Sequence, residues 1–239
     1  MNMFRIRLLK IVFLLTNPKY LLIFLRFRVV PSIEHLTNIK SLIFSNVIDV
    51  GANKGQFSLL VRYIFPSKNI LSFEPLNGCS AIIRNLFAKD KNIFLYQHAL
   101  SDKDGYDIIY RTKNNDSSSL LKPKLVTQYY PGCSILNKEK IELKTGSSIE
   151  DERLKNCLLK IDVQGSELAV LKGFNKKLRY VKYVLIEISE LELYESQPVF
   201  DDVHSYLLKN GFHLQIKYNT SVVNSREIQS DYLYEKKNY

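Results

Sequence analysis

Residues 47–55 read VIDVGANKG, in which a short apolar strand runs directly into a glycine-bearing turn. The pattern recurs, because further apolar segments alternate with stretches of helical spacing along most of the chain. The predicted strands are residues 47–50, 70–73, 93–97, 158–161 and 183–188, and the predicted helices are residues 56–65, 79–88, 166–171 and 200–209. This alternation predicts an α/β fold with a mostly parallel sheet and helices on both faces.

Some segments depart from this alternation. Residues 213–217 and 231–235 predict a final antiparallel strand pair, and residues 106–110 alternate polar and apolar as a hairpin arm does. Residues 111–138 are rich in Asn, Ser and Lys, so we expect a long surface loop of the kind that often serves as a lid. We also expect the helix that begins at residue 166 to stop at Gly173.

Composition indicates a folded protein with a distinct N-terminal part. The 239 residues are 46% apolar and 24% charged, which is typical of globular domains and excludes a disordered chain. Residues 1–40 hold seven of the 34 basic residues and one of the 24 acids, so they carry +6 of the net +10. We therefore divide the chain into a basic, apolar, helical extension (1–40) and one α/β domain (41–239). Three scattered cysteines indicate a reducing compartment, and we expect a cytoplasmic protein.

The extension contains residues 4–28, FRIRLLKIVFLLTNPKYLLIFLRFR. Its apolar runs are far shorter than the roughly 20 residues that span a bilayer. Asn17 and Pro18 predict a helix cap followed by a first helical position, hence two short helices with a break at 16–17. The helices could cover one face of the body, or residues 1–30 could contact the anionic inner face of a membrane peripherally. Nucleic-acid binding is not expected, because too few positive charges cluster.

In a parallel α/β sheet the ligand lies at the carboxyl ends of the strands. Glycine in the turn after residue 50 lets the backbone approach a ligand, and Glu74 ends the next strand 23 residues beyond Gly51. A carboxylate in that place accepts hydrogen bonds from ribose hydroxyls, which predicts a nucleoside cofactor. A dinucleotide fingerprint is incomplete, because Asn53 and Gln56 stand where its second and third glycines would be.

Five ordered motifs carry a resemblance to a known family. DVGANKGQFS, FEP, HALSDKDG, NNDSSSL and LLKIDVQGSELAVLKG, spread between about residues 46 and 215, resemble the FkbM-type methyltransferases. The resemblance implies a class I Rossmann-like methyltransferase fold with a seven-stranded sheet. It also implies S-adenosylmethionine as cofactor and methylation of a hydroxyl on a sugar, a glycan or a related secondary metabolite.

This resemblance and the strand ends together assign the site. The expected cofactor-binding residues are Asp49, Gly51, Asn53, Gly55, Glu74 and Ala99. The expected catalytic residues are Asp162, as base or acceptor-orienting group, with Glu187 and Glu190 as ligands for sugar hydroxyls. Each has a plainer interpretation, since Asp162 could cap the following helix and the two glutamates could be surface acids. Residues 117–119 could close over the cofactor.

One position departs from the family pattern. The family usually has D-x-E-G, whereas residues 162–165 read DVQG, so Gln164 lacks the expected charge. Two functions follow as hypotheses: an active O-methyltransferase, or a catalytically silent glycan-binding or scaffold protein that keeps the fold. A divalent metal held by Asp162 with Glu187 or Glu190 is compatible with their oxygen ligands, but no full ligand set is evident and we assign no metal site. The expected partner is a sugar or glycan hydroxyl and not a nucleic acid.

Overall fold

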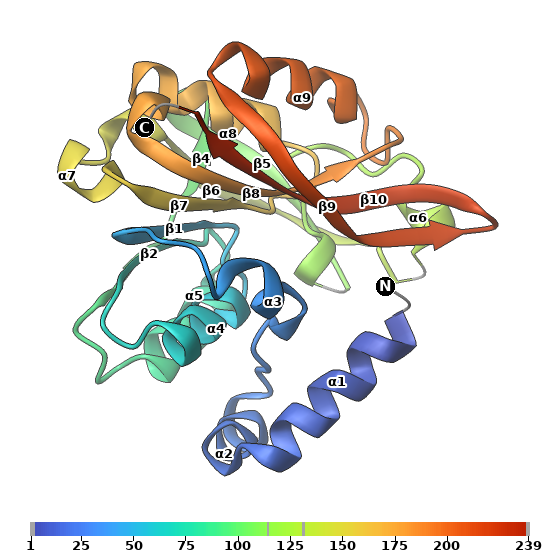
Figure 1. Cartoon of the computed structure of the whole chain (residues 1–239). Helices are drawn as coiled ribbons and strands as arrows, with labels where there is room; N and C mark the ends of the chain where they lie inside the picture. Colours follow the sequence, from blue (N-terminus) through green and yellow to red (C-terminus); the bar gives the residue numbers. More distant parts are fainter. Residues whose placement is uncertain (1–2, 114, 131, 238–239) are drawn as a thin grey trace.

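A seven-stranded sheet forms the centre of the computed structural model, which describes residues 3–113, 115–130 and 132–237 (Figure 1). Its order is β3-β2-β1-β7-β8-β10-β9. The strands from β3 to β8 pair in parallel, and β10 runs antiparallel to both β8 and β9. Their bounds are β1 (Asn46–Val50), β2 (Asn69–Phe73), β3 (Ile93–Tyr96), β7 (Cys157–Ile161), β8 (Val181–Ser189), β9 (Phe212–Val223) and β10 (Arg226–Lys236). The predicted fold class is confirmed, including the antiparallel final pair.

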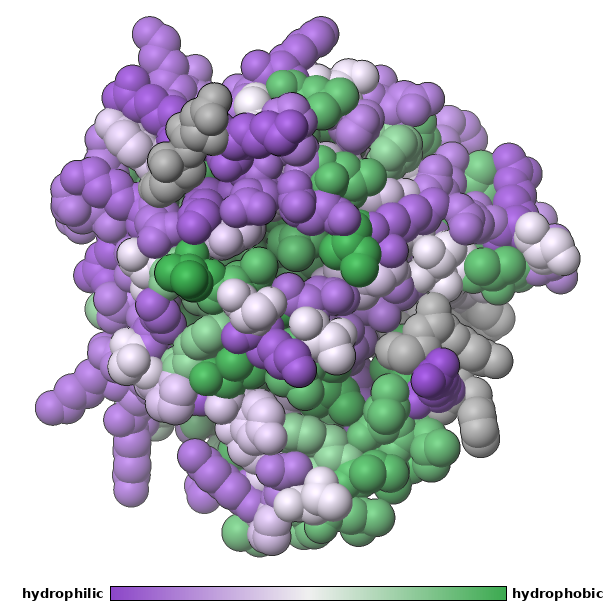
Figure 2. Space-filling view, in the orientation of Figure 1, coloured by the Kyte–Doolittle hydropathy of each residue, from purple (hydrophilic) through white to green (hydrophobic). Residues whose placement is uncertain are grey.

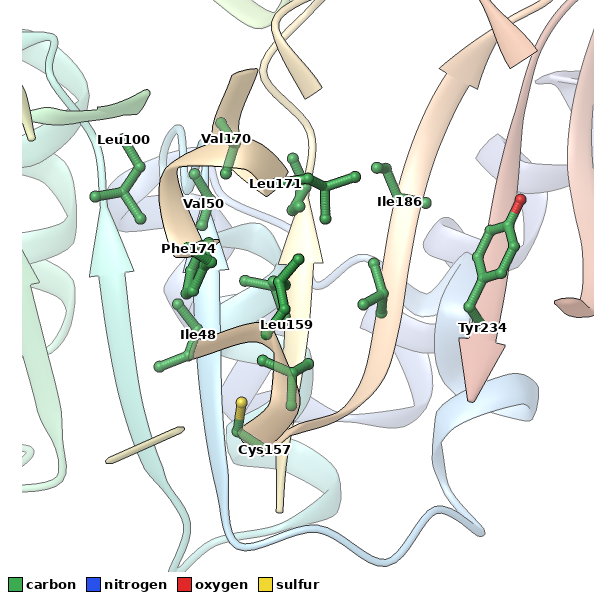
Figure 3. Packing of buried hydrophobic residues seen from close by; sticks show 14 of the residues in the cluster. Ile48, Val50, Leu100, Cys157, Leu159, Val170, Leu171, Phe174, Ile186 and Tyr234 are labelled. Carbon is green, nitrogen blue, oxygen red and sulfur yellow. The ribbon is translucent and has the colours of Figure 1, made fainter. Parts of the chain in front are cut away.

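Helices cover the sheet on both faces (Figure 1). On one face α8 (Glu167–Phe174) and α9 (Phe200–Lys209) pack on the inward side chains of β1, β7 and β8. This is the larger core, in which Leu171 and Phe174 of α8 lie over Ile48 and Leu159 (Figure 3). On the other face α4 (Gln56–Ile64) packs on the same strands, and α5 (Asn77–Leu86) lies beside it. Strands buried on both faces explain the continuous apolar runs in the sequence.

A second, three-stranded sheet corrects the expected loop. It has the order β4-β6-β5 and comprises β4 (Ala99–Ser101), β5 (Gly105–Thr112) and β6 (Ile135–Thr145). The short helices η2 (Asn115–Ser117) and α6 (Val126–Tyr129) lie between β5 and β6, and η3 (Gly146–Ser148) and α7 (Asp151–Leu154) lead back to the main sheet. The predicted long surface loop over 111–138 is therefore shorter in the structure: β5 and β6 take up residues 111–112 and 135–138 at its two ends, and η2 and α6 lie within the rest, where positions 114 and 131 lie outside the described residues. The polar composition continues into β6 because residues 135–138 of this strand are exposed.

The first forty residues form α1 (Met3–Thr16), α2 (Pro18–Phe27), η1 (Ile33–His35) and α3 (Leu36–Ile39). The predicted break at 16–17 is confirmed, but Asn17 does not cap α2; its side-chain amide donates to the Phe13 carbonyl at the end of α1, 2.8 Å away. Phe13 and Tyr20 pack edge-on against each other and against Tyr63 of α4, with centroid distances of 5.1 to 5.4 Å. The helix pair is thus anchored to the body on one side.

Among the described helices, none alone has the length and apolar content to cross a bilayer. The segments Arg5–Thr16 and Pro18–Phe27 have the required length and apolar content only when they are taken together, and the chain bends by 113° between them.

Gly173 lies inside α8 and does not end it, which corrects the expected helix stop. A Cβ atom there would lie 1.9 Å from the carbonyl oxygen of Ser101, so the glycine allows α8 to touch β4. We expect Gly173→Ala to lower the free energy of unfolding by about 1–3 kcal/mol, because backbone must move. Denaturant unfolding monitored by circular dichroism measures this change.

Gly78→Ala is the matched control, since Gly78 lies in α5 with nothing within 4 Å of its added Cβ. It should raise the free energy of unfolding by about 0.5–1 kcal/mol through helix propensity. Equal effects of the two substitutions would contradict the packing argument.

Candidate functional site

One cavity of about 380 Å³ opens at the carboxyl ends of the central strands. This volume lies within the range of small-molecule sites, and its position is the one expected for a parallel sheet. The predicted residues that line it are Gly51, Asn53, Glu74, Ala99, Asp162 and Glu187. Three predicted residues do not line it: Asp49 is buried behind the turn, Gly55 is the N-cap of α4, and Glu190 lies elsewhere.

The turn that follows β1 (residues 51–55, the first turn) sits against the loop that follows β7. Gly51 has φ +75°, and a Cβ atom there would lie 1.9 Å from the carbonyl oxygen of Asp162. Only glycine fits this backbone conformation and this contact. The first turn is therefore held directly beside Asp162, which explains why both line one cavity.

Glu74 joins the first turn to the end of β2. Its carboxylate is buried and accepts hydrogen bonds from the backbone N–H groups of Asn53 (2.9 Å) and Leu76 (2.8 Å). Burial raises the pKa of Glu74 to about 7, although these hydrogen bonds oppose the rise. Each carboxylate oxygen keeps a second lone pair that a ligand hydroxyl can use.

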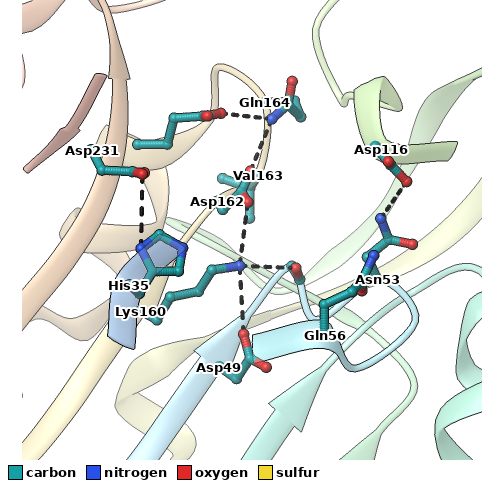
Figure 4. A network of polar contacts seen from close by, with 12 residues as sticks. His35, Asp49, Asn53, Gln56, Asp116, Lys160, Asp162, Val163, Gln164 and Asp231 are labelled. Carbon is teal, nitrogen blue, oxygen red and sulfur yellow. Dashed lines mark hydrogen bonds and ion pairs between the residues drawn. The ribbon is translucent and has the colours of Figure 1, made fainter. Parts of the chain in front are cut away.

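A buried lysine that sequence reasoning missed lies beneath the turn (Figure 4). Nζ of Lys160 lies 3.5 Å from Asp49 Oδ1 and 3.4 Å from Asp162 Oδ2, and donates to the Gly51 carbonyl at 3.3 Å. Burial opposes the charge of Lys160, but the Asp162 and Asp49 carboxylates outweigh it and raise the pKa above its ordinary value. The available signal was a lysine inside an apolar strand, two positions before an aspartate.

Gln164 bridges the two predicted catalytic carboxylates. Its amide Nε2 donates to Asp162 Oδ1 (2.8 Å) and to Glu187 Oε2 (2.9 Å), while its Oε1 accepts from the Tyr194 hydroxyl (3.2 Å). A second amide, from Gln229, donates to the other oxygen of Glu187 at 2.8 Å. Burial first, and then the charges of Asp162 and Asp231, raise the pKa of Glu187 well above its usual range.

The donor set does not fit a metal ion. Both hydrogens of the Gln164 amide point at the carboxylates that would have been the ligands. Over residues 3–113, 115–130 and 132–237, no three His, Cys, Asp or Glu side chains are arranged to hold a metal. Glu190, the other candidate ligand, instead pairs with Lys217 at 2.9 Å and accepts from the Tyr232 hydroxyl.

The segment at 116–119 closes over the first turn. Asp116 accepts a hydrogen bond from the Asn53 side chain (2.7 Å), and the Ser119 hydroxyl donates to the Gln164 carbonyl (2.6 Å). These contacts connect the second sheet to both loops of the site. Ser118 and Ser119 also line the cavity, as expected for a covering element.

The two ends of the chain supply a wall that sequence reasoning did not identify. We call it the terminal wall, and it comprises Ile6, Lys10, Ser32, Glu34 and His35 with Asn219, Thr220, Ser221, Gln229 and Asp231. Within it, Nδ1 of His35 lies 2.8 Å from the Tyr218 hydroxyl and 3.8 Å from Asp231 Oδ2. Burial raises the pKa of Asp231, and the neighbouring His35 opposes this rise. No local motif could reveal this contact, because its partners are nearly 200 residues apart.

Comparison with known proteins identifies the family of this chain. The methyltransferase FkbM domain model matches residues 49–214. Methyltransferase sdnD of Sordaria araneosa is 27% identical over 194 residues, which cover 70% of this chain and 73% of that protein. The 2-O-methyltransferase NoeI of Sinorhizobium fredii is 26% identical over 169 residues, which cover 63% of this chain and 66% of NoeI. Among solved structures, one similar fold is that of Sp1610 of Streptococcus pneumoniae, which is proposed to be a tRNA methyltransferase. Its TM-score is 0.50 at 12% sequence identity, and the matched part covers 85% of this chain and 69% of the Sp1610 chain. The last likeness shows the fold alone.

The Lys160 interactions lead to a stability prediction. In Lys160→Met the fully buried Asp49 would lose its cation, so we expect the free energy of unfolding to fall by about 3–5 kcal/mol. Denaturant unfolding at neutral pH measures the loss. Lys172→Met on the exposed side of α8 is the control and should change the value by less than about 0.5 kcal/mol. Similar small effects in both variants would show that Asp49 does not need the lysine.

Proposed function

Because this chain belongs to the FkbM methyltransferase family and is an S-adenosylmethionine-dependent methyltransferase, we propose that it methylates a hydroxyl group of a sugar or glycan. The observation that carries the proposal is the convergence of the first turn, Glu74, Asp162 and Glu187 on one cavity. The name of NoeI, a 2-O-methyltransferase, supports oxygen as the atom that accepts the methyl group. The cavity has a mixed lining, and its polar groups, among them Asn219, Gln229 and Asp231, support a hydroxyl-rich acceptor.

The residues present fit the cofactor. Glu74 would accept hydrogen bonds from the ribose hydroxyls, and the first turn would hold the backbone close to the ligand through Gly51 and Asn53. Ala99, at the start of β4, would contact the adenine. Asp49 would act indirectly, because it is buried behind the turn and holds Lys160. Bound S-adenosylmethionine supplies a methyl group on a sulfonium, which is already a good leaving group.

The protein's remaining task is to align the acceptor hydroxyl and to remove its proton. Asp162 and Glu187 are held at fixed positions by Lys160 and by the amides of Gln164 and Gln229. Their oxygens would therefore orient acceptor hydroxyls by accepting hydrogen bonds. Gln164 keeps both carboxylates in place without adding a third negative charge, so its presence supports an active enzyme over a silent scaffold.

We expect the ionised form of Glu74 to bind the cofactor best. Its pKa of about 7 means that the carboxylate is protonated below pH 7 and ionised above it. The affinity for S-adenosylmethionine should therefore fall about tenfold for each pH unit below about 7, and should level off above it. Titration calorimetry measures this affinity, and Glu74→Gln should show weak binding that does not change with pH.

The unaltered protein should also transfer a labelled methyl group from S-adenosylmethionine to an oxygen of methyl glycosides of glucose, galactose or mannose.

Glu167→Gln is the matched control. Glu167 is also buried with a pKa of about 7, but it accepts from the backbone N–H groups of Val163 and Gly165 and does not line the cavity. This variant should keep the pH dependence of cofactor binding. Absence of cofactor binding in the unaltered protein would refute the proposal, and methyl transfer only to nitrogen or carbon would refute the hydroxyl acceptor.

We also propose that the protein works in the cytoplasm, peripherally on the anionic face of a membrane. All three cysteines are free and buried, which supports a reducing compartment. Figure 2 shows apolar side chains gathered over α1, where Leu8, Ile11 and Leu15 are each more than half exposed. On α2, Leu22 and Leu25 are exposed as well. Six of the seven basic residues among residues 1–40 are also exposed, and they complement anionic headgroups.

The membrane proposal predicts co-sedimentation with vesicles of phosphatidylcholine and phosphatidylglycerol. Binding should weaken with added salt, and the double substitution Leu15→Asp, Leu22→Asp should abolish it. Ile43→Asp is the control, because Ile43 is an exposed apolar residue outside α1 and α2 and should not affect binding. Unchanged sedimentation of the double variant, or equal binding to pure phosphatidylcholine, would contradict the proposal.

A further inference from the structure

The terminal wall lies outside the residues that match the family model. The members of the wall come from residues 6–35 and from residues 219–231 of the β9–β10 hairpin. The family match covers residues 49–214 and so includes none of them. The groups proposed to hold the cofactor, Glu74 and the first turn, come from the matched part. The wall instead presents hydroxyl, amide, carboxylate and imidazole groups to the same cavity, which are suitable ligands for an acceptor rich in hydroxyls.

His35 is the centre of this wall. It is buried, and the rings of Phe57 and Tyr218 contact it edge-on with centroids 5.6 and 5.8 Å away. Its Nδ1 faces the Tyr218 hydroxyl and the Asp231 carboxylate. The Tyr218 hydroxyl, the hydrogen-bond partner of Nδ1, can accept from it or donate to it, whereas Asp231 at 3.8 Å acts on the ring as a charge. When Nδ1 carries the hydrogen and donates to the Tyr218 oxygen, Nε2 is left as an acceptor.

The Asp231 carboxylate is itself held in place. The Asn219 side chain donates to its Oδ2 at 2.7 Å. On the other side of the wall, Lys10 of α1 pairs with Glu34 at 3.0 Å. The charged groups on this side of the cavity are therefore Asp231 and the Glu34–Lys10 pair, and Lys160 lines the same cavity.

The carboxylates of Asp162 and Glu187 are already held by donors at each oxygen, whereas Nε2 of His35 is not. Glu187 accepts an amide hydrogen bond at each oxygen, and Asp162 is held by Gln164 and Lys160. By contrast, no described residue forms a hydrogen bond with Nε2 of His35. In Figure 4 the ring nitrogen that does not face Asp231 points toward the side on which Lys160 and Asp162 are drawn. His35 and Asp162 line the same cavity.

We propose that the terminal wall is the acceptor subsite and that Nε2 of His35 takes the proton from the acceptor hydroxyl. This inference rests on the proposed hydroxyl acceptor. The proton moves from the acceptor oxygen to Nε2, an electron pair of that oxygen forms the bond to the methyl carbon, and the pair of the broken carbon–sulfur bond stays on sulfur. Asp231 stabilises the imidazolium that results, because its carboxylate lies beside Nδ1.

The test compares His35→Ala with the unaltered full chain, using labelled S-adenosylmethionine and the methyl glycosides named above. We expect kcat to fall by about 10²–10⁴-fold, since a general base contributes that much. Binding of S-adenosylhomocysteine, followed by calorimetry, should be unchanged. Added imidazole should restore part of the activity, which a purely structural role of His35 would not allow.

His204→Ala is the matched control. His204 also has its Nδ1 beside a tyrosine hydroxyl, that of Tyr234 at 3.0 Å, and it stacks on Phe200, but it does not line the cavity. Its kcat should equal that of the unaltered protein and should not respond to imidazole. Unchanged kcat in His35→Ala, or a loss that imidazole does not reduce, overturns the inference.

A measurement that needs no acceptor tests the role of His35 even if no glycoside is methylated. Nitrogen magnetic resonance of the unaltered protein at about pH 8 reports the tautomer of each histidine, and His35→Gln assigns the signal. A bare Nε2 on His35 is expected, and a proton on Nε2 overturns the inference. Failure of the glycosides alone would instead count against the sugar acceptor, and failure to bind S-adenosylhomocysteine would count against the proposed function.

Discussion

The site depends on one buried cation. Lys160 lies between Asp49 of β1 and Asp162 at the end of β7, and it also donates to the Gly51 carbonyl. The parallel register that pairs Asp49 with Lys160 brings these groups together inside the sheet. A buried cation with two carboxylates is stable only when all three stay in place, so the strand ends, the first turn and the orientation of Asp162 are coupled. Replacing any of them would disturb the others.

Around this centre, neutral side-chain amides donate hydrogen bonds to the carboxylates, which in other carboxylate clusters are bound by a metal ion. Gln164 and Gln229 satisfy the oxygens of Asp162 and Glu187, so two acids can share a small cavity. The departure from the family's D-x-E-G pattern is thus explained by its contacts. The residues that line the cavity come from two parts of the chain. The part that matches the family model provides the groups suited to the cofactor, and the two chain ends provide the terminal wall. The helices that carry part of this wall, through Lys10 of α1, also present the apolar and basic surface proposed for a membrane.

Most of the fold could be predicted from the sequence, because strand–helix alternation and buried apolar strands are local patterns. The mostly parallel main sheet, the antiparallel final pair and the break between α1 and α2 agree with those patterns. The second sheet was missed, because exposed polar residues in β6 have the composition of a loop. Gly173 was misread as a helix stop, because the reason for it is a contact with Ser101, some 70 residues away in the chain.

The sequence by itself determined which residues lie at the carboxyl ends of the strands, and hence that Gly51, Glu74, Asp162 and Glu187 share a cavity. Parallel strands leave no other place for the residues that follow them. Only the tertiary structure decided that Glu190 turns away to Lys217, that Gln164 bridges two acids, and that His35 meets Asp231. Such contacts depend on register and on how distant segments pack, which no local pattern in the chain encodes.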